Sequence, residues 1–485
     1  MQKRGTLALD VGTSSIRASL YVKDEGMKCT FSEKHYLEER FYIEELWKNI
    51  FQLIKKMTRS LDDVSIEVIG VSAFLGWVIV NKNGEPIDKA WSWMSYGDKR
   101  ELKKAQEIFD EDIHVIIGRE LTEQLGVFYW GKNIRTLNED AIILSVKDFI
   151  NYKLTNSFMM DRSHASYTGL YSIKESDWDF NLFKAFDLPF SAVPRLGYGN
   201  EIVGNVSRRI QSQLGLSEDT KVILGGPDGT LAILGSGGFK SGCSIEVMGT
   251  TDVFFHVIDS ADTKAVVQNG LVQNSHILPG LFCVGGPTGM TGGTLDWLMR
   301  KKNWNYDHKD FRNMVNNWKE LKAAESGLFI ISALTGARVP DWNPHTRGTI
   351  VGLNPSHNFE EIFKATLEGI SFNTKRIINK IQSVVGAIHS IIAIGGGAKN
   401  HEFIQTRASI AGRSILIPKE IEASTFGILA LASVAIDWYE TIEEAVSRLN
   451  PIKYVIEPND EDIKKYYKLC EQYDKLVKMM NEWYH

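Results

Sequence analysis

Two segments in opposite halves of this 485-residue chain share one pattern: an apolar run, a Gly-Thr turn rich in hydroxyl groups, and a second apolar run. The first is LALDVGTSSIRASLYV at residues 7–22, and the second is IEVMGTTDVFFHVI at residues 245–258. Apolar residues on both sides of a tight turn predict a β-hairpin. The second copy of the pattern predicts two similar halves, each opening on such a hairpin.

Helices and strands are expected to alternate along much of the chain, which indicates an α/β fold. Residues 42–61 and most of 99–154 have helical spacing, whereas residues 65–87 predict two strands joined by the turn NKNGEP. In the last third we expect, in order, a helix at 359–381, a strand at 389–397, a helix at 401–412, a strand at 413–418, and helices at 424–437 and 459–483. The segment GSGGFKSG at residues 235–242 interrupts the pattern, so we place a boundary there between domains 1–238 and 239–485.

Composition narrows the class of partner. The chain has 55 basic and 60 acidic residues and a net charge of −5, which gives no reason to expect nucleic acid or a membrane surface as partner. No run approaches the ~18 apolar residues of a membrane span, and the opening apolar run is too short for a secretory leader. Four scattered cysteines without a C-x-x-C pair argue against a disulfide framework and a zinc site and fit a cytoplasmic protein.

One aspartate stands alone on a glycine turn. The stretch ILGGPDGTLAILGSGG at residues 223–238 places Asp228 between a predicted strand and a predicted helix. A carboxylate in that position is typical of a helix N-cap. The alternative is a catalytic base, because open α/β sheets place their chemistry at the carboxyl ends of strands.

The first hairpin turn, LDVGTSSIR, has the composition of an anion-binding loop. Gly12 lets the backbone approach an oxygen atom closely, and Thr13 and Ser14 add hydroxyl donors. Asp10 could hold a hydrated Mg²⁺ ion, and Arg17 could offset phosphate charge. The alternative is an ordinary β-turn, and the chain contains no Walker motif.

Three further glycine-rich segments follow the same logic. In VMGTTDV, Gly249, Thr250 and Thr251 could hold a terminal phosphate from the opposite side. The segments AIGGGAKN and GGPTGMTGGTLDWL place glycines before predicted helices, where a nucleotide or a phosphate can approach closely. A glycine triplet is also compatible with a plain turn.

Six motifs occur in the order found in one kinase family. They are LDVGTSSIRASLYV, GGPDGT, VMGTTDVFF, TGARVPDWNPHTRGTIVGL, ATLEGISFNTK and the block that runs from IGGGAKNHEFIQ to STFGILALASVAI. Over nearly its whole length the chain resembles the FGGY carbohydrate kinases, which include xylulokinase, ribulokinase, gluconate kinase and glycerol kinase. The resemblance implies an α/β, actin-like ATPase fold in which two RNase H-like domains flank a central cleft. It also implies that ATP lies mainly on the second domain and the sugar mainly on the first.

The resemblance assigns roles residue by residue. Asp228 matches the catalytic base, and Asp10, acting through water, and Asp228 match the positions that hold Mg²⁺. The phosphate-binding positions are Gly12, Thr13, Ser14, Arg17, Gly249, Thr250 and Thr251. The nucleotide-binding positions are Gly292, Gly293, Gly395, Gly396, Gly397 and Asn400.

The sugar site departs from the pattern. Where xylulokinases carry Q-M-H-G, this chain has Phe74 and Leu75, followed by Trp77, so a histidine that binds the sugar is missing. In WSWMSYGDKR, either Asp98 or Ser95 fills the acidic position of the W-x-D-x-R segment. We expect Phe74, Leu75, Trp77, Asp98 and Asp228 to contact the substrate, although core packing is an equal alternative for the tryptophan.

The resulting prediction is an ATP- and Mg²⁺-dependent kinase that phosphorylates a hydroxyl of a small sugar or polyol. A ketopentose such as D-xylulose is the first candidate, and gluconate, erythritol and glycerol are alternatives. A non-catalytic nucleotide switch on the same fold is disfavoured, because that class lacks the GG-x-D-G turn. The oligomeric state stays open, with a homodimer as one outcome.

Overall fold

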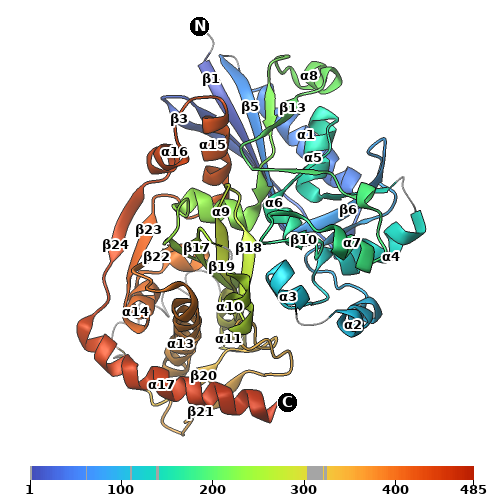
Figure 1. The fold of residues 1–485 in the computed structure, drawn as a ribbon. Helices are drawn as coiled ribbons and strands as arrows, with labels where there is room; N and C mark the ends of the chain where they lie inside the picture. Colours follow the sequence, from blue (N-terminus) through green and yellow to red (C-terminus); the bar gives the residue numbers. More distant parts are fainter. Residues whose placement is uncertain are drawn as a thin grey trace.

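A computed structural model describes residues 3–61, 63–109, 112–137, 141–260, 262–302, 321 and 325–484. Within these residues, two seven-stranded sheets dominate the molecule, and the long helix α17 (Asp460–Trp483) crosses the end opposite the N-terminus (Figure 1). None of the described helices combines the length and the apolar character needed to cross a membrane. Cys29, Cys243, Cys283 and Cys470 are free thiols.

The first sheet contains the first predicted hairpin. Its order is β13-β14-β5-β1-β2-β3, with β15 paired beside β5. The strands are β1 (Lys3–Val11), β2 (Ser15–Val22), β3 (Gly26–Lys34), β5 (Val64–Ala73), β13 (Ile202–Asn205), β14 (Lys221–Ile223) and β15 (Gly226–Pro227).

The second sheet contains the second predicted hairpin and has the order β18-β19-β17-β16-β22-β23-β24. Its strands are β16 (Ser244–Met248), β17 (Thr251–Ile258), β18 (Val272–Ser275), β19 (Phe282–Met290), β22 (Ser390–Ile394), β23 (Ser414–Pro418) and β24 (Ile452–Ile456).

The two sheets repeat one pairing scheme. Strand β1 runs antiparallel to β2 and parallel to β5, and β16 runs antiparallel to β17 and parallel to β22. In each half the parallel partner pairs onward with another parallel strand, β14 or β23. The prediction of two similar α/β halves is therefore confirmed, and the position of the domain boundary stays a prediction.

The helices follow the expected alternation, with the apolar face of each long helix turned inward. In the first half they are α1 (Ile43–Thr58), α2 (Lys99–Ile108), α3 (Asp112–Ile117), α4 (Gly126–Leu137), α5 (Val146–Thr155), α6 (Arg162–Ala165), α7 (Phe180–Ala185), α8 (Arg208–Leu214) and α9 (Asp228–Ser236). In the second half they are α10 (Thr263–Gln268), α11 (Gly292–Lys302), α13 (Phe359–Val385), α14 (His401–Ala411), α15 (Ser424–Ala435), α16 (Ile442–Leu449) and α17.

The expectation of a mostly helical stretch at 99–154 misses one strand. β8 (Ala141–Ser145) lies inside it and joins a small sheet of order β4-β7-β6-β8, with β4 at Arg40–Phe41, β6 at Gly76–Asn81 and β7 at Ala90–Ser92. The run AIILS is too short and too uniformly apolar for periodicity to separate a strand from a helix. The described residues also form three two-stranded sheets: β9 (Met159–Asp161) with β12 (Arg195–Gly197), β10 (Tyr171–Ser172) with β11 (Asp177–Trp178), and β20 (Phe329–Ile331) with β21 (Thr349–Val351).

Helices α9 and α15 join the two halves. They belong to different halves of the sequence, yet Leu231, Leu234 and Ile428 share one buried cluster with Ala8 and Val68 of the first sheet. The two helix backbones approach so closely that a Cβ atom on Gly235 would lie 2.1 Å from the Ala423 carbonyl oxygen. The crossing therefore depends on glycine.

We expect Gly235→Ala to weaken this crossing. Its methyl group would also lie 2.4 Å from the backbone nitrogen of Gly427, so the two helices must separate. The cost should be about 3 kcal/mol of unfolding free energy, measured by urea denaturation. The matched control is Gly131→Ala on α4, where the nearest atom is at 3.5 Å and the higher helix propensity of alanine should leave stability unchanged or raised. Equal stability of Gly235→Ala and wild type would contradict the packing argument.

Candidate active site

The register of three parallel strands brings two acidic residues to one edge of the first sheet. Asp10 lies opposite Ser72 of β5, and Ser72 lies opposite Gly226 of β15. Asp228 follows two residues later as the first residue of α9. The sheet thus places both predicted Mg²⁺-binding carboxylates close to each other.

The backbone path of the turn before Asp228 requires glycine at position 225. Gly225 has φ of +67°, and a Cβ atom there would lie 2.0 Å from the carbonyl oxygen of Val71. The N-cap of α9 is Pro227, and the Asp228 carboxylate accepts a hydrogen bond of 2.7 Å from the N–H of Gly229. The alternative in which Asp228 caps its helix is therefore wrong. The Asp228 side chain is partly exposed, and the bond from Gly229 is its one side-chain hydrogen bond among the described residues.

Burial and like charge tune both carboxyl groups. Burial, reinforced by the negative charge of Asp10, raises the pKa of Asp228 to about 6. The N–H of Gly229 and the nearby His164 lower this pKa but do not cancel the shift. Burial also raises the pKa of Asp10, although Ser424, Arg17 and Ser72 oppose that shift. A carboxylate with a pKa near neutral is well matched to accepting a proton from a hydroxyl group.

The first glycine turn lies directly beside Asp10. The N–H of Gly12 donates to the carbonyl of Ser15 at 2.9 Å, and Ser14 is exposed. The exposed Trp93 donates its indole N–H to the Thr13 hydroxyl at 3.0 Å, so this tryptophan borders the loop rather than the core.

Arg17 of the same hairpin contacts two acidic residues. Its guanidinium lies 3.7 Å from the Asp10 carboxylate and forms an ion pair with Glu422, which precedes α15. Arg17 is therefore positioned between the first hairpin and a segment from the second half of the chain.

The second loop and the start of α11 form one unit. The N–H groups of Gly292 and Gly293 donate to the carbonyls of Gly249 and Thr250 at 3.0 Å each. Thr250 and Thr251 are exposed. The structure thus brings together the second predicted phosphate loop and one pair of predicted nucleotide-binding glycines.

The glycine triplet lies against the same loop. Gly395 has φ of +85°, and a Cβ atom there would lie 2.7 Å from the carbonyl oxygen of Met248, the residue before Gly249. Gly397 also approaches Met248, and Gly396 faces open space. Asn400 caps α14 by accepting from the N–H of Phe403 at 3.1 Å, so its side-chain oxygen already has a structural partner.

The residues predicted to contact the sugar differ in how exposed their side chains are. Phe74 is buried and packs edge-on against Phe41, whereas Leu75 is partly exposed. Trp77 is buried, with its ring centroid 6.4 Å from that of His164. Substrate contact by these residues stays a prediction.

Asp98 and Ser95 differ in the way their side chains are used. Asp98 caps α2 by accepting from the N–H of Arg100 at 2.9 Å and remains partly exposed. Ser95 is buried, and its hydroxyl donates to the carbonyl of Glu39 at 2.5 Å. Asp98 is thus the more accessible of the two candidates for the acidic position.

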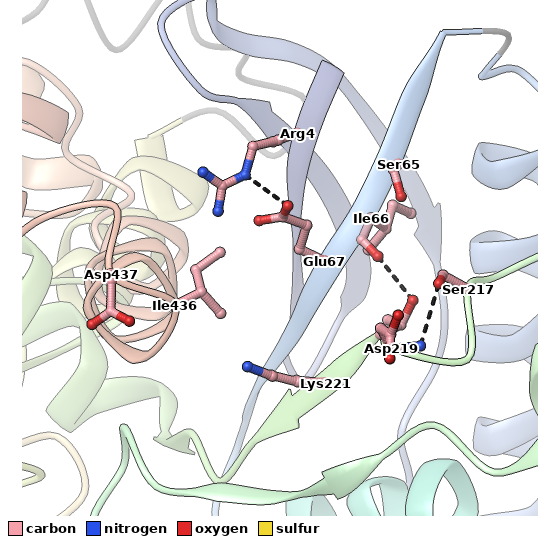
Figure 2. A pocket seen from close by; sticks show the side chains of 10 residues that line it. Arg4, Ser65, Ile66, Glu67, Ser217, Asp219, Lys221, Ile436 and Asp437 are labelled. Carbon is pink, nitrogen blue, oxygen red and sulfur yellow. Dashed lines mark hydrogen bonds and ion pairs between the residues drawn. The ribbon is translucent and has the colours of Figure 1, made fainter. Parts of the chain in front are cut away.

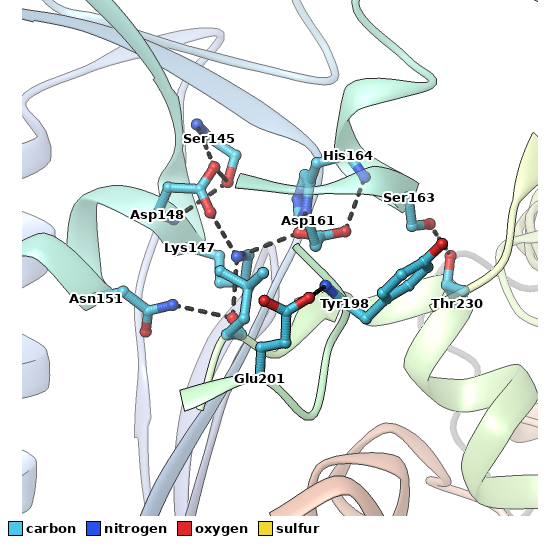
Figure 3. A network of polar contacts seen from close by, with 11 residues as sticks. Ser145, Lys147, Asp148, Asn151, Asp161, Ser163, His164, Tyr198, Glu201 and Thr230 are labelled. Carbon is cyan, nitrogen blue, oxygen red and sulfur yellow. Dashed lines mark hydrogen bonds and ion pairs between the residues drawn. The ribbon is translucent and has the colours of Figure 1, made fainter. Parts of the chain in front are cut away.

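A buried charge network that the sequence analysis missed supports the turn before Asp228 (Figure 3). Lys147 Nζ and Asn151 Nδ2 each donate to the Leu224 carbonyl at 2.9 Å, which fixes the chain just before Gly225. Lys147 also contacts Asp148 and lies 3.1 Å from Asp161. Burial opposes the charge on Lys147, but the two carboxylates outweigh it and raise the lysine pKa.

His164 completes this network. Its Nδ1 lies 2.7 Å from the Asp161 carboxylate, and its buried Nε2 has no hydrogen-bond partner within the described residues. The segment KDFINYKL gives one signal for the network, because it places a lysine and an aspartate on what is otherwise the apolar side of a helix.

A second missed network lies under the loop at 249–251. Arg407 is fully buried, forms an ion pair with Glu246 and lies 3.7 Å from Asp252. Burial, reinforced by the negative charge of Glu246, raises the pKa of Asp252 to about 8. The polar core of the second half therefore holds one arginine between two carboxyl groups.

A pocket of about 330 Å³ lies at the other end of the first sheet (Figure 2). Arg4, at the start of β1, lines it together with Glu67 and Lys221, and the Arg4 guanidinium bonds to Glu67 at 2.7 Å. Its charges are mixed, and none of the predicted site residues lines it.

Duplicated sheets joined by two crossing helices, with hydroxyl-rich turns in both halves, define the actin-like class of ATPase folds. Residues 6–235 match the model of the N-terminal domain, and residues 246–436 the model of the C-terminal domain, of the FGGY family of carbohydrate kinases. The chain belongs to this family. It is therefore a phosphotransferase that uses ATP and a small sugar-type acceptor, as the resemblance implied.

Full-length relatives carry several substrate names. A Staphylococcus epidermidis xylulose kinase is 27% identical over 99% of this chain and 98% of its own length. A Thermococcus gammatolerans glycerol kinase is 26% identical over 99% of both chains. A Bacillus subtilis gluconokinase is 24% identical over 99% of this chain and 96% of its own length.

Solved structures share the fold throughout. The ligand-bound xylulose kinase of Lactobacillus acidophilus superimposes with a TM-score of 0.90 at 21% identity over 99% of both chains. The gluconate kinase of the same organism gives 0.89 at 21% identity, again over 99% of both chains. The α/β two-domain prediction is confirmed.

We expect Asp228→Asn to stabilise the folded protein at alkaline pH. The folded carboxyl group has a pKa of about 6, raised from 3.8, so between these values the folded state binds a proton that the unfolded chain has lost. Wild-type stability from this group therefore rises as the pH falls, and the advantage of the asparagine variant should shrink between about pH 6 and pH 4.

Melting temperatures measured across this range test the expectation. The control is Asp219→Asn, which removes an exposed carboxylate and should not alter the profile. A melting temperature for Asp228→Asn at or below that of wild type at every pH would show that Asp228 carries no destabilising charge.

Proposed function

We propose that Asp228 is the general base for transfer of the γ-phosphoryl group of ATP to a sugar hydroxyl. The observation that carries the proposal concerns the Asp228 carboxylate. It is partly exposed, it lies just after the end of a strand, and its pKa is about 6. At neutral pH it is ionised and basic enough to accept the hydroxyl proton as the oxygen attacks phosphorus. Placement and charge stabilisation supply most of the remaining catalysis in such a transfer.

The phosphate groups are proposed to lie between the two hairpin turns. Gly12, Thr13 and Ser14 offer backbone N–H groups and hydroxyls from the first half, and Gly249, Thr250 and Thr251 offer the same from the second. The exposure of Ser14, Thr250 and Thr251 supports this role. Arg17 would exchange part of its contact with Glu422 for phosphate oxygens, since both are anionic acceptors.

The rest of the nucleotide is proposed to follow the glycines of the second half. Gly292 and Gly293 are bonded to the 249–250 loop, and Gly395, Gly396 and Gly397 follow β22, the neighbour of β16. The absence of Cβ atoms lets a flat base approach the backbone closely. Asn400 would contribute through its amide nitrogen, because its oxygen caps α14.

Asp10 and Asp228 fit a Mg²⁺ ion. Both offer carboxylate oxygens, and no group of three His, Cys, Asp or Glu side chains within the described residues forms a dedicated metal cluster. This donor set suits Mg²⁺, which keeps several waters and binds through one or two carboxylates together with phosphate oxygens. When bound, the ion would neutralise charge on the transferring phosphoryl group.

The acceptor is proposed to bind near Asp228 among Phe74, Leu75, Trp77 and Asp98. The names of the relatives favour a ketopentose such as D-xylulose, with gluconate and glycerol as alternatives and erythritol as another polyol. Their identities are too similar to rank these acceptors. We also propose residues 1–238 as the sugar domain and 239–485 as the nucleotide domain. The four free thiols and the charge balance support a cytoplasmic enzyme without nucleic-acid or membrane partners, either monomeric or homodimeric.

The direct test is ADP release from Mg-ATP across pentuloses, hexuloses, sugar acids and polyols. We expect one class to stimulate turnover, and Asp228→Asn to lower kcat by about 10³-fold because the proton acceptor is lost. Nucleotide affinity, measured by calorimetry, should change little. The Asp219→Asn control should keep full activity. Unchanged kcat in Asp228→Asn would remove Asp228 from the catalytic step.

A second test separates the two roles of Asp10. Asp10→Asn should raise the Mg²⁺ concentration needed for half-maximal turnover, because one carboxylate ligand is lost. It should also move the acid limb of kcat/KM, expected near pH 6 in wild type, to lower pH, because the charge of Asp10 raises the pKa of Asp228. The Asp219→Asn control should show neither effect. Unaltered Mg²⁺ dependence together with an unaltered pH limb would contradict both assignments.

A further inference from the structure

Arg119 is a half-buried cation in an unusual environment. It follows α3 in the first half of the chain, and its side chain reaches the second half, where the guanidinium contacts the Asn274 side-chain oxygen on β18. Its Nε is buried without a hydrogen-bond partner, and burial lowers its pKa. The groups that act on the guanidinium pKa are burial and Tyr167, and no described carboxylate is among them. Removing a cation from water without a negative partner is costly.

Two more deeply buried arginines show how this chain meets that cost elsewhere. Arg407 pairs with Glu246. Arg376 pairs with Asp341 and Asp474, both at 2.8 Å. The described partners of Arg119 are the Asn274 amide and Tyr167, which contributes its hydroxyl and its ring, with the ring centroid 4.4 Å from Cζ. Its charge is left for a partner outside the described chain.

The position of this guanidinium is fixed by its neighbours. Asn274 accepts from Arg119 and donates to the Tyr167 hydroxyl at 3.2 Å, which locks the amide. The preceding Gly118 accepts from the N–H of Gln273 at 2.8 Å, and a Cβ atom at Gly118 would lie 2.5 Å from the Gln273 carbonyl oxygen. The segment therefore lies directly against β18, and the cation is oriented in advance of any ligand.

Tyr167 links this cation to the catalytic edge. It is partly exposed, and burial raises the pKa of its hydroxyl while the negative charge of Asp228 adds to the shift. Tyr167 thus lies within electrostatic reach of Asp228, and its ring also stacks against the Arg119 guanidinium. An anionic acceptor that approaches Asp228 and Asp10 would be repelled, and a cation in this position would offset that repulsion.

We infer that Arg119 binds the carboxylate of a sugar-acid substrate and thereby selects it over neutral sugars and polyols. The inference rests on the proposed function, and it narrows the acceptor class at the same site. A guanidinium presents its N–H donors in a fixed fork that matches a carboxylate. The substrate anion would supply the negative partner that the described residues do not.

Matched pairs of acceptors test the selection. Initial rates of ADP release with Mg-ATP are compared for gluconate and glucitol, xylonate and xylitol, glycerate and glycerol, and for D-xylulose. We expect the best acid to exceed its neutral partner and D-xylulose in kcat/KM by at least about tenfold. A neutral acceptor with the highest kcat/KM would overturn the inference and leave the kinase assignment intact. Absence of turnover with every acceptor would overturn both.

Variants of Arg119 assign the effect to this residue. Arg119→Gln should lower kcat/KM for the acid by about 100-fold, mainly through KM, while the neutral partner changes by less than about threefold. Arg119→Lys should restore part of the loss because it keeps the charge. ATP affinity measured by calorimetry reports folding, and Arg209→Gln, an exposed arginine on α8, is the control. Equal losses for acid and neutral acceptors, or no rescue by lysine, would show that Arg119 has a structural role instead.

Discussion

The fold holds two carboxylates close together at one edge of the first sheet, and the proposed chemistry depends on both. Parallel pairing of β1, β5 and β15 brings their backbones together, because Asp10 and Gly226 both lie opposite Ser72 and Asp228 follows Gly226 by two residues. The repulsion is tolerated because Arg17 and the N–H of Gly229 offset part of it. Burial raises the pKa of Asp228 to about 6, and the charge of Asp10 adds to that shift. A strained pair of this kind is suited to receive a divalent cation and a hydroxyl proton.

The second requirement is that the two halves of the chain meet around this edge. Helices α9 and α15 cross at Gly235 and Gly427, and α9 begins at Asp228 itself. The helix that begins at Asp228 is therefore the same helix that contacts the second half. Arg17 and Glu422 add a polar link near the phosphate loops, and Arg119 and Asn274 add another near the proposed acceptor site. Any relative movement of the halves would be felt at Asp228.

Local patterns in the sequence predicted the parts of the site that local geometry creates. The hairpins around Gly12 and Gly249 and the strand-to-helix turn at Asp228 are formed by adjacent residues, so alternation and glycine position were sufficient. The supporting networks were not predictable in this way. Lys147 reaches Leu224, and Arg407 reaches Glu246, across long separations in sequence. The residue types alone are compatible with solvent-exposed ion pairs, and only the folded sheet order buries them.

Sequence reasoning was also limited for the acceptor. Aromatic residues such as Phe74 and Trp77 can pack in a hydrophobic core or stack against a sugar, and the sequence does not separate these roles. Both side chains are buried here. Arg119, the residue proposed to select the acceptor, belongs to no motif. It stands out only in the folded structure, where no described carboxylate acts on its charge. Acceptor selection by Arg119 would come from a segment outside the family motifs, and relatives at similar identity carry different substrate names.

A crystal structure of the complex with Mg²⁺, a non-hydrolysable ATP analogue and the best acceptor tests the central claim most directly. The account predicts that an acceptor hydroxyl lies ~3 Å from the Asp228 carboxylate. It also predicts that the residues of both hairpin turns contact the terminal phosphate. A complex in which Asp228 is remote from every acceptor hydroxyl, or in which the terminal phosphate contacts neither turn, would contradict it.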